Sequence, residues 1–573
     1  MRILFDSKNE KYKKPFGALK SGQVCFFNIL VPKSCPAKKV YLVIEKDGET
    51  ETHVEMSSVT EENEYISFQT RITIDEPGLY FYWFFIEKEK DGFRLLKEGY
   101  CDTNMEAGDK WQLLCYDKNY HSPDWAKGAV IYQIFPDRFN KCGCPDLKSK
   151  LTPFYLHENH KDNPNSQPDA YGNWNNDFFG GNLQGIIEKL DYIKDLGADI
   201  IYLNPIVKAF SNHRYDTADY KAVDPMLGTT DDFSQLCNEA HKRNIRIIID
   251  GVFSHTGNKS IYFESAINNE NSPYRDWYDF KSFPNEYTAW WGIKTLPQIK
   301  KGHPDFMNFI VEDVVEFWLK LGADGVRLDV ADELTDEFIE KLSKKAKELK
   351  KDALIMGEVW EDASNKISYS VRRKYLLGYE LDSVMNYPFL NAIVGFVKGE
   401  KSSKQFAEEI MTIVENYPKE ILNCCMNMLS THDTVRIITL LKDSKKFDSY
   451  KLLKIAAFLQ FMLPGAPSIY YGDEIGMEGE KDPFNRRYFE WDKVDCELHV
   501  FYKKLCELKH KFNQLKFGNI RFEDKENILL FYRDELKIIV NMTELPYDID
   551  GDIIFCENFK DRKIDKYGFA IVK

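Results

Sequence analysis

The sequence lacks any long apolar segment of the kind that crosses a membrane or directs export. Near the N-terminus a single three-residue apolar run is interrupted by Asp6 and Lys8, so no signal-peptide core is predicted. The longest apolar stretch, residues 455–472, contains Pro464 and Pro467 and is predicted as a buried helix followed by a buried strand. We therefore expect a cytoplasmic protein.

Paired cysteine motifs and an excess of basic residues are also missing. The 12 cysteines are scattered without a CxxC pair, which favours a reduced protein over a disulfide framework. The net charge of −14 argues against nucleic acid or an anionic membrane as a partner. Aromatic residues are plentiful at 14%; most fit large cores, and exposed clusters would suit flat apolar ligands such as sugar rings.

The pattern along the chain predicts three parts. Residues 1–122 alternate short apolar runs with polar turns, which indicates an N-terminal β-sandwich. Residues 123–515 alternate buried strands with amphipathic helices, and residues 516–573 return to short strands. The predicted fold class is therefore α/β: a (β/α)8 TIM barrel with a lid-like insertion at about 251–304 after strand 3, flanked by the sandwich and a small C-terminal β domain.

The predicted barrel elements follow from length and apolar spacing. Eight strands are expected, at residues 129–135, 198–204, 245–250, 322–329, 353–358, 383–388, 424–433 and 468–474. One of the helical stretches between them is expected at 305–322. Another should begin after the capping residue Thr335.

The fourth predicted strand ends in an unusual way for a buried strand. Arg327 and Asp329 are two residues apart, so their side chains share one face of the strand. A structural ion pair is the simpler explanation for such a pair on its own. Other strand ends carry polar residues too: Asp250 and His255, Glu358 and Trp360, and His432 and Asp433. Because catalytic groups of a barrel come from the C-terminal ends of several strands, these residues are predicted to form one active site.

Three acids, an arginine and two histidines, without a convincing metal-ligand set, suit cleavage of a glycosidic bond. A retaining glycosidase needs a nucleophilic carboxylate and a protonated acid roughly 5 Å apart. Arg327 would favour the ionised form of Asp329, which is the expected nucleophile. Glu358 is the expected proton donor, kept protonated by neighbouring acids. Asp433, His255 and His432 suit hydrogen bonds to sugar hydroxyls.

Four motifs, "DGVFSH", "GVRLDVADE", "GEVW" and "STHD", occur in this order and resemble those of the α-amylase superfamily, glycoside hydrolase family 13. The resemblance implies that Asp329 is the nucleophile, Glu358 the acid/base and Asp433 the stabiliser of the transition state. The substrate-binding residues implied or favoured are His213, Tyr215, His255, Arg327, Trp360, His432, Asp482 and Arg486. Tyr215 could equally be a loop-packing residue, and Asp482 with Arg486 could equally be a surface ion pair.

Finer motifs are similar to the branch of neopullulanases, cyclomaltodextrinases and maltogenic amylases. They are "FFGGNLQGI", "YGDEIGMEG", "DPFNRR" and Glu333, four residues after the nucleophile. Departures occur in "LPQIK" (296–300), where this branch reads close to MPKLN, and at Ser254, where Asn is usual. Asn182 and Cys142 stand where relatives carry calcium-binding carboxylates, so we expect no cofactor and no tightly bound calcium at that place.

The resemblance implies hydrolysis of α-1,4 bonds, with α-1,6 bonds left open, in cyclodextrins, pullulan or maltooligosaccharides by double displacement. An α-amylase or a pullulanase on the same scaffold remains an alternative, and so does a non-catalytic glucan-binding relative, although all three acids are present. The expected partner is an α-glucan oligosaccharide, with neither nucleic acid nor membrane. Aromatic residues on both faces of the strand at 78–87 need a second cover, which is either this chain's own barrel or a second subunit in a homodimer.

Overall fold

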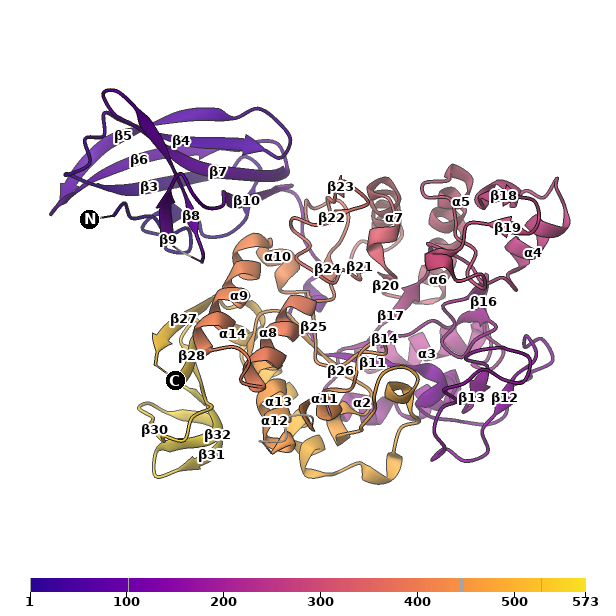
Figure 1. The fold of residues 1–573 in the computed structure, drawn as a ribbon. Helices are drawn as coiled ribbons and strands as arrows, with labels where there is room; N and C mark the ends of the chain where they lie inside the picture. Colours follow the sequence, from indigo (N-terminus) through magenta and orange to yellow (C-terminus); the bar gives the residue numbers. More distant parts are fainter. Residues whose placement is uncertain (1, 101, 443–447, 527) are drawn as a thin grey trace. The chain divides into compact units, whose positions relative to one another are not determined.

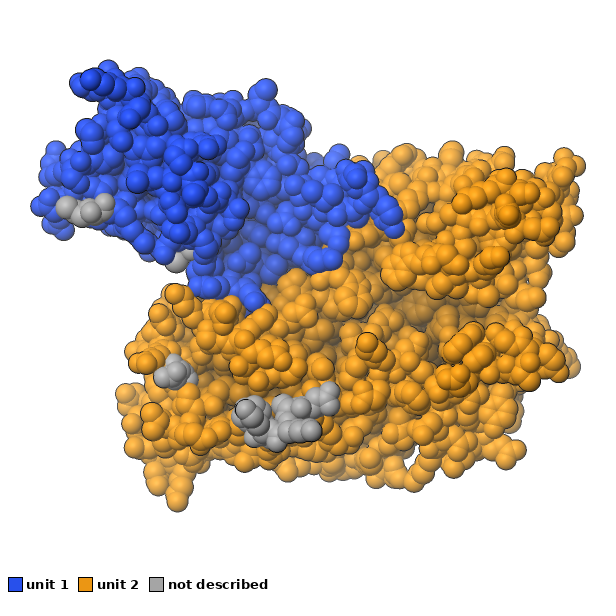
Figure 2. Space-filling model, in the orientation of Figure 1, with its two compact units in different colours: residues 1–121, 361–380, 407–422 blue, residues 122–360, 381–406, 423–573 orange. Residues whose placement is uncertain are grey.

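The computed structural model describes residues 2–100, 102–442, 448–526 and 528–573. The chain packs into two compact units, coloured separately in Figure 2. Unit 1 comprises residues 1–121, 361–380 and 407–422, and unit 2 comprises residues 122–360, 381–406 and 423–573. The predicted sandwich therefore does not pack alone, because two segments from much later in the chain belong to the same unit.

Unit 1 is built on a ten-stranded sheet in which β1-β3-β6-β5-β4-β7-β10-β2 are neighbours and β8 and β9 extend from β7. The strands are β1 (Lys13–Lys14), β2 (Leu19–Lys20), β3 (Val24–Pro32), β4 (Lys39–Lys46), β5 (Thr52–Glu62), β6 (Tyr65–Thr73), β7 (Gly78–Glu87), β8 (Gly92–Glu98), β9 (Asp102–Met105) and β10 (Trp111–Tyr116). A short hairpin, β22 (Ile367–Ser368) and β23 (Val371–Arg372), lies in the later segment.

The aromatic strand β7 is covered on both faces within unit 1. On one face Tyr82 and Phe84 are fully buried in the main core. On the other face Phe81 is paired with Gln112 of β10, and residues paired in this way present their side chains to the same side. Gln112 donates a hydrogen bond to Ser364 Oγ at 2.7 Å. The chain's own segment 361–380 therefore lies at the second face of β7.

Unit 2 contains the predicted barrel (Figure 1). Its parallel strands are β11 (Ile131–Ile134), β14 (Ile200–Leu203), β17 (Arg246–Gly251), β20 (Gly325–Leu328), β21 (Leu354–Gly357), β24 (Ser383–Val384), β25 (Met426–Met428) and β26 (Ala466–Tyr470). Each pairs with the next in sequence, β26 pairs with β11, and a parallel bridge between Met385 and Met426 joins β24 to β25. The ring is closed, which confirms the predicted fold class.

Helices along the chain include α1 (Leu183–Glu188), α2 (Leu190–Leu196), α3 (Thr230–Lys242), α5 (Pro304–Asn308), α6 (Glu316–Leu321), α7 (Asp336–Leu349), α8 (Tyr387–Val397), α9 (Ser403–Asn416), α10 (Lys419–Leu422), α11 (Ile437–Lys442), α12 (Ser449–Met462), α13 (Glu497–Lys511) and α14 (Asn513–Phe517). Of these, α10 and most of α9 belong to unit 1, and the others belong to unit 2. Thr335 caps α7 as expected, with its hydroxyl accepting the Phe338 N–H at 3.2 Å. The helical stretch predicted at 305–322 is present, and within it a π-helical segment, Phe309–Val315, lies between α5 and α6. The strand predicted at 383–388 is too long, since Asn386 caps α8.

The remaining elements lie in the loops between barrel strands and in the C-terminal part of the chain. The loop after β11 contains β12 (Tyr155–Leu156) and β13 (Asp177–Phe178), and a hairpin of β15 (Val207–Ala209) and β16 (Thr217–Val223) follows β14. The insertion after β17 holds α4 (Ile261–Asn268), β18 (Phe280–Ser282) and β19 (Glu286–Tyr287). The C-terminal sheet has its own small core and consists of β27 (Ile520–Lys525), β28 (Ile528–Arg533), β29 (Leu536–Asn541), β30 (Tyr547–Asp548), β31 (Ile553–Lys560) and β32 (Lys563–Val572). Within the described ranges no helix is long and apolar enough to span a membrane.

Candidate active site

Arg327 lies at the centre of a buried cluster of carboxylates at the C-terminal ends of neighbouring barrel strands. Its Nη1 is 2.8 Å from Asp250 Oδ1 and 2.9 Å from Asp329 Oδ1, and its Nη2 is 2.9 Å from Glu358 Oε2. The guanidinium is fully buried. Parallel pairing of β17, β20 and β21 produces this arrangement, because it places Asp250 beside Arg327 and brings the strand ends together. One arginine therefore contacts three carboxylates, whereas a simple structural ion pair involves only one.

The backbone between Asp329 and the next helix is strained and contacts Glu358. Val330 has a φ of 37°, a left-handed conformation that a β-branched residue rarely adopts. Its N–H donates to Glu358 Oε2 at 2.8 Å. Trp360 Nε1 donates to Glu358 Oε1 at 3.1 Å, and the half-exposed Trp360 ring stacks on Tyr387 at 4.1 Å. Both oxygens of Glu358 are thus held in place, at a strained position of the kind that clusters at functional sites.

Asp250 is a functional residue that the sequence analysis noted at a strand end without assigning it a role. Its Oδ2 accepts hydrogen bonds from the hydroxyls of Tyr202, at 2.6 Å, and Tyr215, at 2.8 Å. Tyr215 is therefore part of the buried network rather than loop packing. Tyr202, inside β14, was missed, because a tyrosine in an apolar strand gives no sign of which side chain it will meet.

His432 joins this network through both ring nitrogens. Gln133 donates to Nδ1 at 3.0 Å, so the ring proton lies on Nε2, which contacts the Tyr215 hydroxyl. Asn204 Nδ2 also donates to that hydroxyl, at 3.1 Å. Burial lowers the pKa of His432 well below its usual range, and the cations of Arg486 and Arg327 add to this. His432 is therefore neutral at neutral pH. The other members, Gln133 and Asn204, carried no sequence signal.

Two further predicted histidines are also neutral. His213 Nδ1 accepts the Tyr215 N–H at 3.1 Å, and burial lowers the pKa of His213 well below its usual range. His255 Nδ1 lies 2.9 Å from Ser254 Oγ. The serine that stands in place of the usual asparagine therefore still gives this ring a hydrogen-bond partner. Burial lowers the pKa of His255 to about 4. Its buried Nε2 has no hydrogen-bond partner among the described residues, so it can bond a ligand hydroxyl.

Asp433, Asp482 and Arg486 lie together. Arg486 Nη1 is 2.9 Å from Asp482 Oδ1, and its Nη2 is 3.4 Å from Asp433 Oδ1. Its Nε donates to the His432 carbonyl at 2.9 Å. The pair Asp482 and Arg486 is thus an i,i+4 ion pair, but a buried Arg486 also reaches a candidate catalytic acid, so it is not only a surface feature.

Three aspartates of the site, Asp329, Asp250 and Asp433, have pKa values raised above the usual range of an aspartate. Burial raises the pKa of Asp329 well above its usual range; Arg327 opposes this, while Glu358, Asp250 and Asp433 reinforce it. Burial also raises the pKa of Asp250 and of Asp433, against the lowering effect of Arg327. Arg327 therefore acts on Asp329 in the predicted direction, but burial and the other acids outweigh it in the free protein. These acids titrate as one unit.

The region where relatives place calcium is held by side-chain amides. Asn182 Oδ1 accepts the Gly185 N–H at 2.7 Å and caps α1, and its Nδ2 donates to the Cys142 carbonyl at 2.7 Å. Asn140 Nδ2 donates to the Gly185 carbonyl at 3.0 Å. No group of three His, Cys, Asp or Glu side chains with metal-ligand geometry occurs in the part of the chain that is described.

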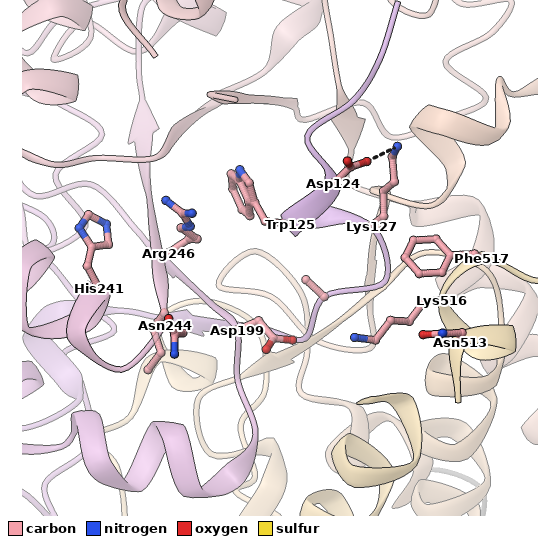
Figure 3. A pocket seen from close by; sticks show the side chains of 12 residues that line it. Asp124, Trp125, Lys127, Asp199, His241, Asn244, Arg246, Asn513, Lys516 and Phe517 are labelled. Atoms are coloured by element: carbon pink, nitrogen blue, oxygen red, sulfur yellow. Dashed lines mark hydrogen bonds and ion pairs between the residues drawn. The ribbon is translucent and has the colours of Figure 1, made fainter. Parts of the chain in front are cut away.

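A separate cavity of about 570 Å³ lies at the opposite end of the barrel, where β14 and β17 begin (Figure 3). It is lined by Asp124, Trp125, Lys127, Ala129, Asp199, His241, Asn244, Ile245, Arg246, Asn513, Lys516 and Phe517. Beside it the buried Asp324 accepts hydrogen bonds from His241, Arg246 and Lys350. Polar residues at this end of a barrel contribute to stability, so the cavity is not part of the candidate active site.

Comparisons with known proteins agree with this geometry. Residues 133–500 match the family described as alpha amylase, catalytic domain. An amylopullulanase from Thermoanaerobacter thermohydrosulfuricus is 35% identical over 90% of this chain, which spans 39% of that relative's length. A cyclomaltodextrinase from Geobacillus thermopakistaniensis (strain MAS1) is 35% identical over 75% of this chain and 72% of its own. A solved structure described as a cyclomaltodextrinase has a TM-score of 0.71 at 27% identity and covers 98% of both chains.

The match to the catalytic-domain family covers most of the barrel and includes every residue of the carboxylate cluster. Two further amylopullulanases also match 90% of this chain. All three are longer proteins, and this chain spans between 31% and 45% of their length. The cyclomaltodextrinase is matched over most of its length. Together with the closed barrel and its buried acids, these matches show that the chain belongs to the α-amylase family of glycoside hydrolases.

Proposed function

We propose that this protein hydrolyses α-glucosidic bonds of cyclodextrins, pullulan or maltooligosaccharides by double displacement. The observation that carries the proposal is the buried cluster in which Asp329, Glu358 and Asp250 share Arg327. Asp329 attacks the anomeric carbon while Glu358 protonates the leaving oxygen, and Glu358 then deprotonates the water that breaks the glucosyl–Asp329 ester. The α configuration is retained because displacement occurs twice.

The polar side chains around the cluster support the sugar-binding part of the proposal. His213, His255 and His432 are neutral, so they can exchange hydrogen bonds with hydroxyl groups without adding charge. Asp433 would bind hydroxyls of the distorted ring more strongly in the transition state. Trp360 offers a half-exposed indole beside Glu358 for a glucose next to the cleaved bond. All three proposed catalytic acids are present, which disfavours a non-catalytic glucan-binding role.

A second candidate, an enzyme that also cleaves α-1,6 bonds, is favoured by the matches to amylopullulanases over 90% of the chain. Product analysis on β-cyclodextrin, pullulan and starch distinguishes the candidates. Maltose or panose with preference for β-cyclodextrin or pullulan supports the first, and maltotriose from pullulan supports the second. Proton NMR should show the α-anomer first; a β-anomer, or no product from any substrate, would contradict the mechanism.

We also propose a cytoplasmic homodimer without tightly bound calcium. A relative described as an intracellular maltogenic amylase supports the location. The dimer rests on the family resemblance alone, because the second face of β7 is covered by this chain's own segment 361–380. Sedimentation velocity at micromolar concentration should give twice the mass of one chain. A monomer under these conditions would contradict the proposed dimer but would not affect the catalytic proposal.

A further inference from the structure

The insertion after β17 carries an aromatic stack that the mechanism above does not use. The rings of Trp290 and Trp291 are stacked, with centroids 4.1 Å apart and planes 12° apart. Trp290 also packs on the ring of His255, at 4.9 Å between centroids. Trp291 is 71% exposed, whereas His255 is buried in the candidate active site. The stack therefore runs from the site to the surface in two ring contacts.

Trp291 is held exposed by a strained backbone. Its φ of 48° and ψ of 27° are left-handed, a conformation that large side chains avoid. Hydrogen bonds of the loop fix this conformation: the Trp290 N–H donates to the Leu296 carbonyl at 2.9 Å, and the Ile293 N–H donates to the Trp290 carbonyl at 3.0 Å. Core packing cannot explain an exposed ring in a disfavoured conformation. Such strain is typical of residues that position a ligand.

Trp290 adds an unused polar group to the stack. Its indole Nε1 is buried and has no hydrogen-bond partner among the described residues. A buried N–H without an acceptor is costly, so a ligand that supplies one gains affinity. His255 Nε2, the polar atom of the neighbouring ring, is in the same state. The stack thus combines an open aromatic face with polar ring atoms that lack a partner among the described residues, a combination that suits the apolar face and the hydroxyl rim of a hexose ring.

We propose that Trp290 and Trp291 form a platform for a glucose unit beyond the two that flank the cleaved bond, and that Trp291 sets the preference for longer chains. This inference rests on the proposed function and adds a specificity-determining residue to it. In this view the wild-type protein cleaves maltoheptaose with a much higher kcat/KM than maltotriose, because only the longer chain reaches the platform.

The test compares kcat/KM on the linear series from maltotriose to maltoheptaose for Trp291→Gly, Trp291→Tyr and the wild type. Trp291→Gly should lower kcat/KM for maltoheptaose about tenfold, mainly through KM, and that for maltotriose less than about twofold. Trp291→Tyr should keep most of the chain-length dependence. The melting temperature of Trp291→Gly should be unchanged or higher, since glycine relieves the left-handed strain. Phe517→Ala, which removes an exposed aromatic ring at the far end of the barrel, is the matched control and should change neither substrate.

Two outcomes would contradict the proposal that Trp290 and Trp291 form a glucose-binding platform. One is an equal loss on maltotriose and maltoheptaose, which indicates general damage, and the other is no loss on either. A lower melting temperature for Trp291→Gly would show a structural role instead. Failure of the wild type to cleave any member of the series would contradict the proposed function itself. In that case calorimetry with maltoheptaose on the same variants decides whether the platform binds glucan.

Discussion

At the scale of single residues, Asp329 is the side chain whose change should separate chemistry from binding. In Asp329→Asn the amide keeps the shape of the carboxylate but cannot attack carbon, so kcat on maltotriose should fall by several orders of magnitude. Folding should persist, because Arg327 keeps Asp250 and Glu358 as partners. Initial rates and calorimetric binding of maltotriose test this. Residual activity above a few per cent would mean that the nucleophile is misassigned.

Glu358 should show a different dependence on the leaving group. Glu358→Gln keeps an acceptor for the Val330 N–H but cannot donate a proton to a glucosidic oxygen. Because fluoride leaves without protonation, the first step on an α-glucosyl fluoride should be largely preserved, whereas cleavage of maltotriose should be lost. Pre-steady-state release of fluoride measures that step. Equal damage on both substrates would exclude the acid role.

His255 should contribute to the pH dependence of stability. Its ordinary pKa of 6.5 is lowered by burial to about 4 in the folded protein. Between these values the unfolded chain binds a proton that the folded chain does not, so this contribution is complete above pH 6.5 and is lost as the pH falls toward 4. The loss at pH 5 should be about 2 kcal/mol. Urea unfolding of the wild type and of His255→Asn at pH 7 and pH 5 should show a smaller decrease for the variant; equal decreases would contradict the burial effect.

At the scale of elements, Asp324 joins three strand–helix units at the base of the barrel. It directly precedes β20 and accepts hydrogen bonds from His241 at the end of α3, at 2.7 Å, from Arg246 in β17, at 3.1 Å, and from Lys350 after α7, at 2.6 Å. Burial favours its neutral form, but the hydrogen bonds from His241 and Lys350 outweigh this and lower the pKa of Asp324 to about 2. Asp324 is therefore a buried charge that connects these three units at the base of the barrel.

Asp324→Asn should consequently reduce the free energy of unfolding by about 2 kcal/mol, since it removes the buried charge that accepts hydrogen bonds from three partly exposed side chains. The specific activity of the folded fraction should not change, because the site lies at the other end of the strands. Asp191→Asn removes an exposed carboxylate that pairs with Arg243, and this control should leave the melting temperature within experimental error. If Asp324→Asn instead lost activity without losing stability, Asp324 would influence the active site rather than stability.

The π-helical segment shows why an element can be predicted while its geometry is not. Buried residues occur in adjacent pairs at 310–311, 314–315 and 318–319, a spacing that fits an α-helix. The apolar pattern therefore continues unchanged through Phe309–Val315, where the hydrogen bonds shift to the π type. One additional residue per turn alters the pattern too little to be read from the sequence.

At the scale of the whole molecule, removing divalent cations should have little effect. Side-chain amides of Asn140 and Asn182 make hydrogen bonds where relatives use carboxylates, so a hard cation finds little negative charge there. EDTA should lower the melting temperature by no more than about 2 °C, a change that corresponds to about 2 kcal/mol for a protein of this size. A larger decrease that calcium restores and magnesium does not would reveal a site built from other oxygens.

Which segments of the chain make up unit 1 depends on contacts between residues that are far apart in the sequence. Lys8 Nζ is 3.0 Å from Glu415 Oε2, far away in the sequence, and both side chains are largely buried. Arg372 likewise pairs with Asp47 at 2.7 Å. Apolar periodicity describes residues that are close in sequence, so it predicted a sandwich that ends at residue 122 and could not include segments 361–380 and 407–422.

The sequence by itself determined the eight alternating strands and the acids and histidines at their ends, because periodicity and strand termini are local properties of the chain. Only the tertiary structure decided how those residues share charge and hydrogen bonds. The position of Asp250 beside Arg327, the proton on His432 Nε2 and the exposure of Trp291 depend on which strands and loops become neighbours. Burial and three nearby acids also raise the pKa of Asp329 against the lowering effect of Arg327, which depends on the same neighbours.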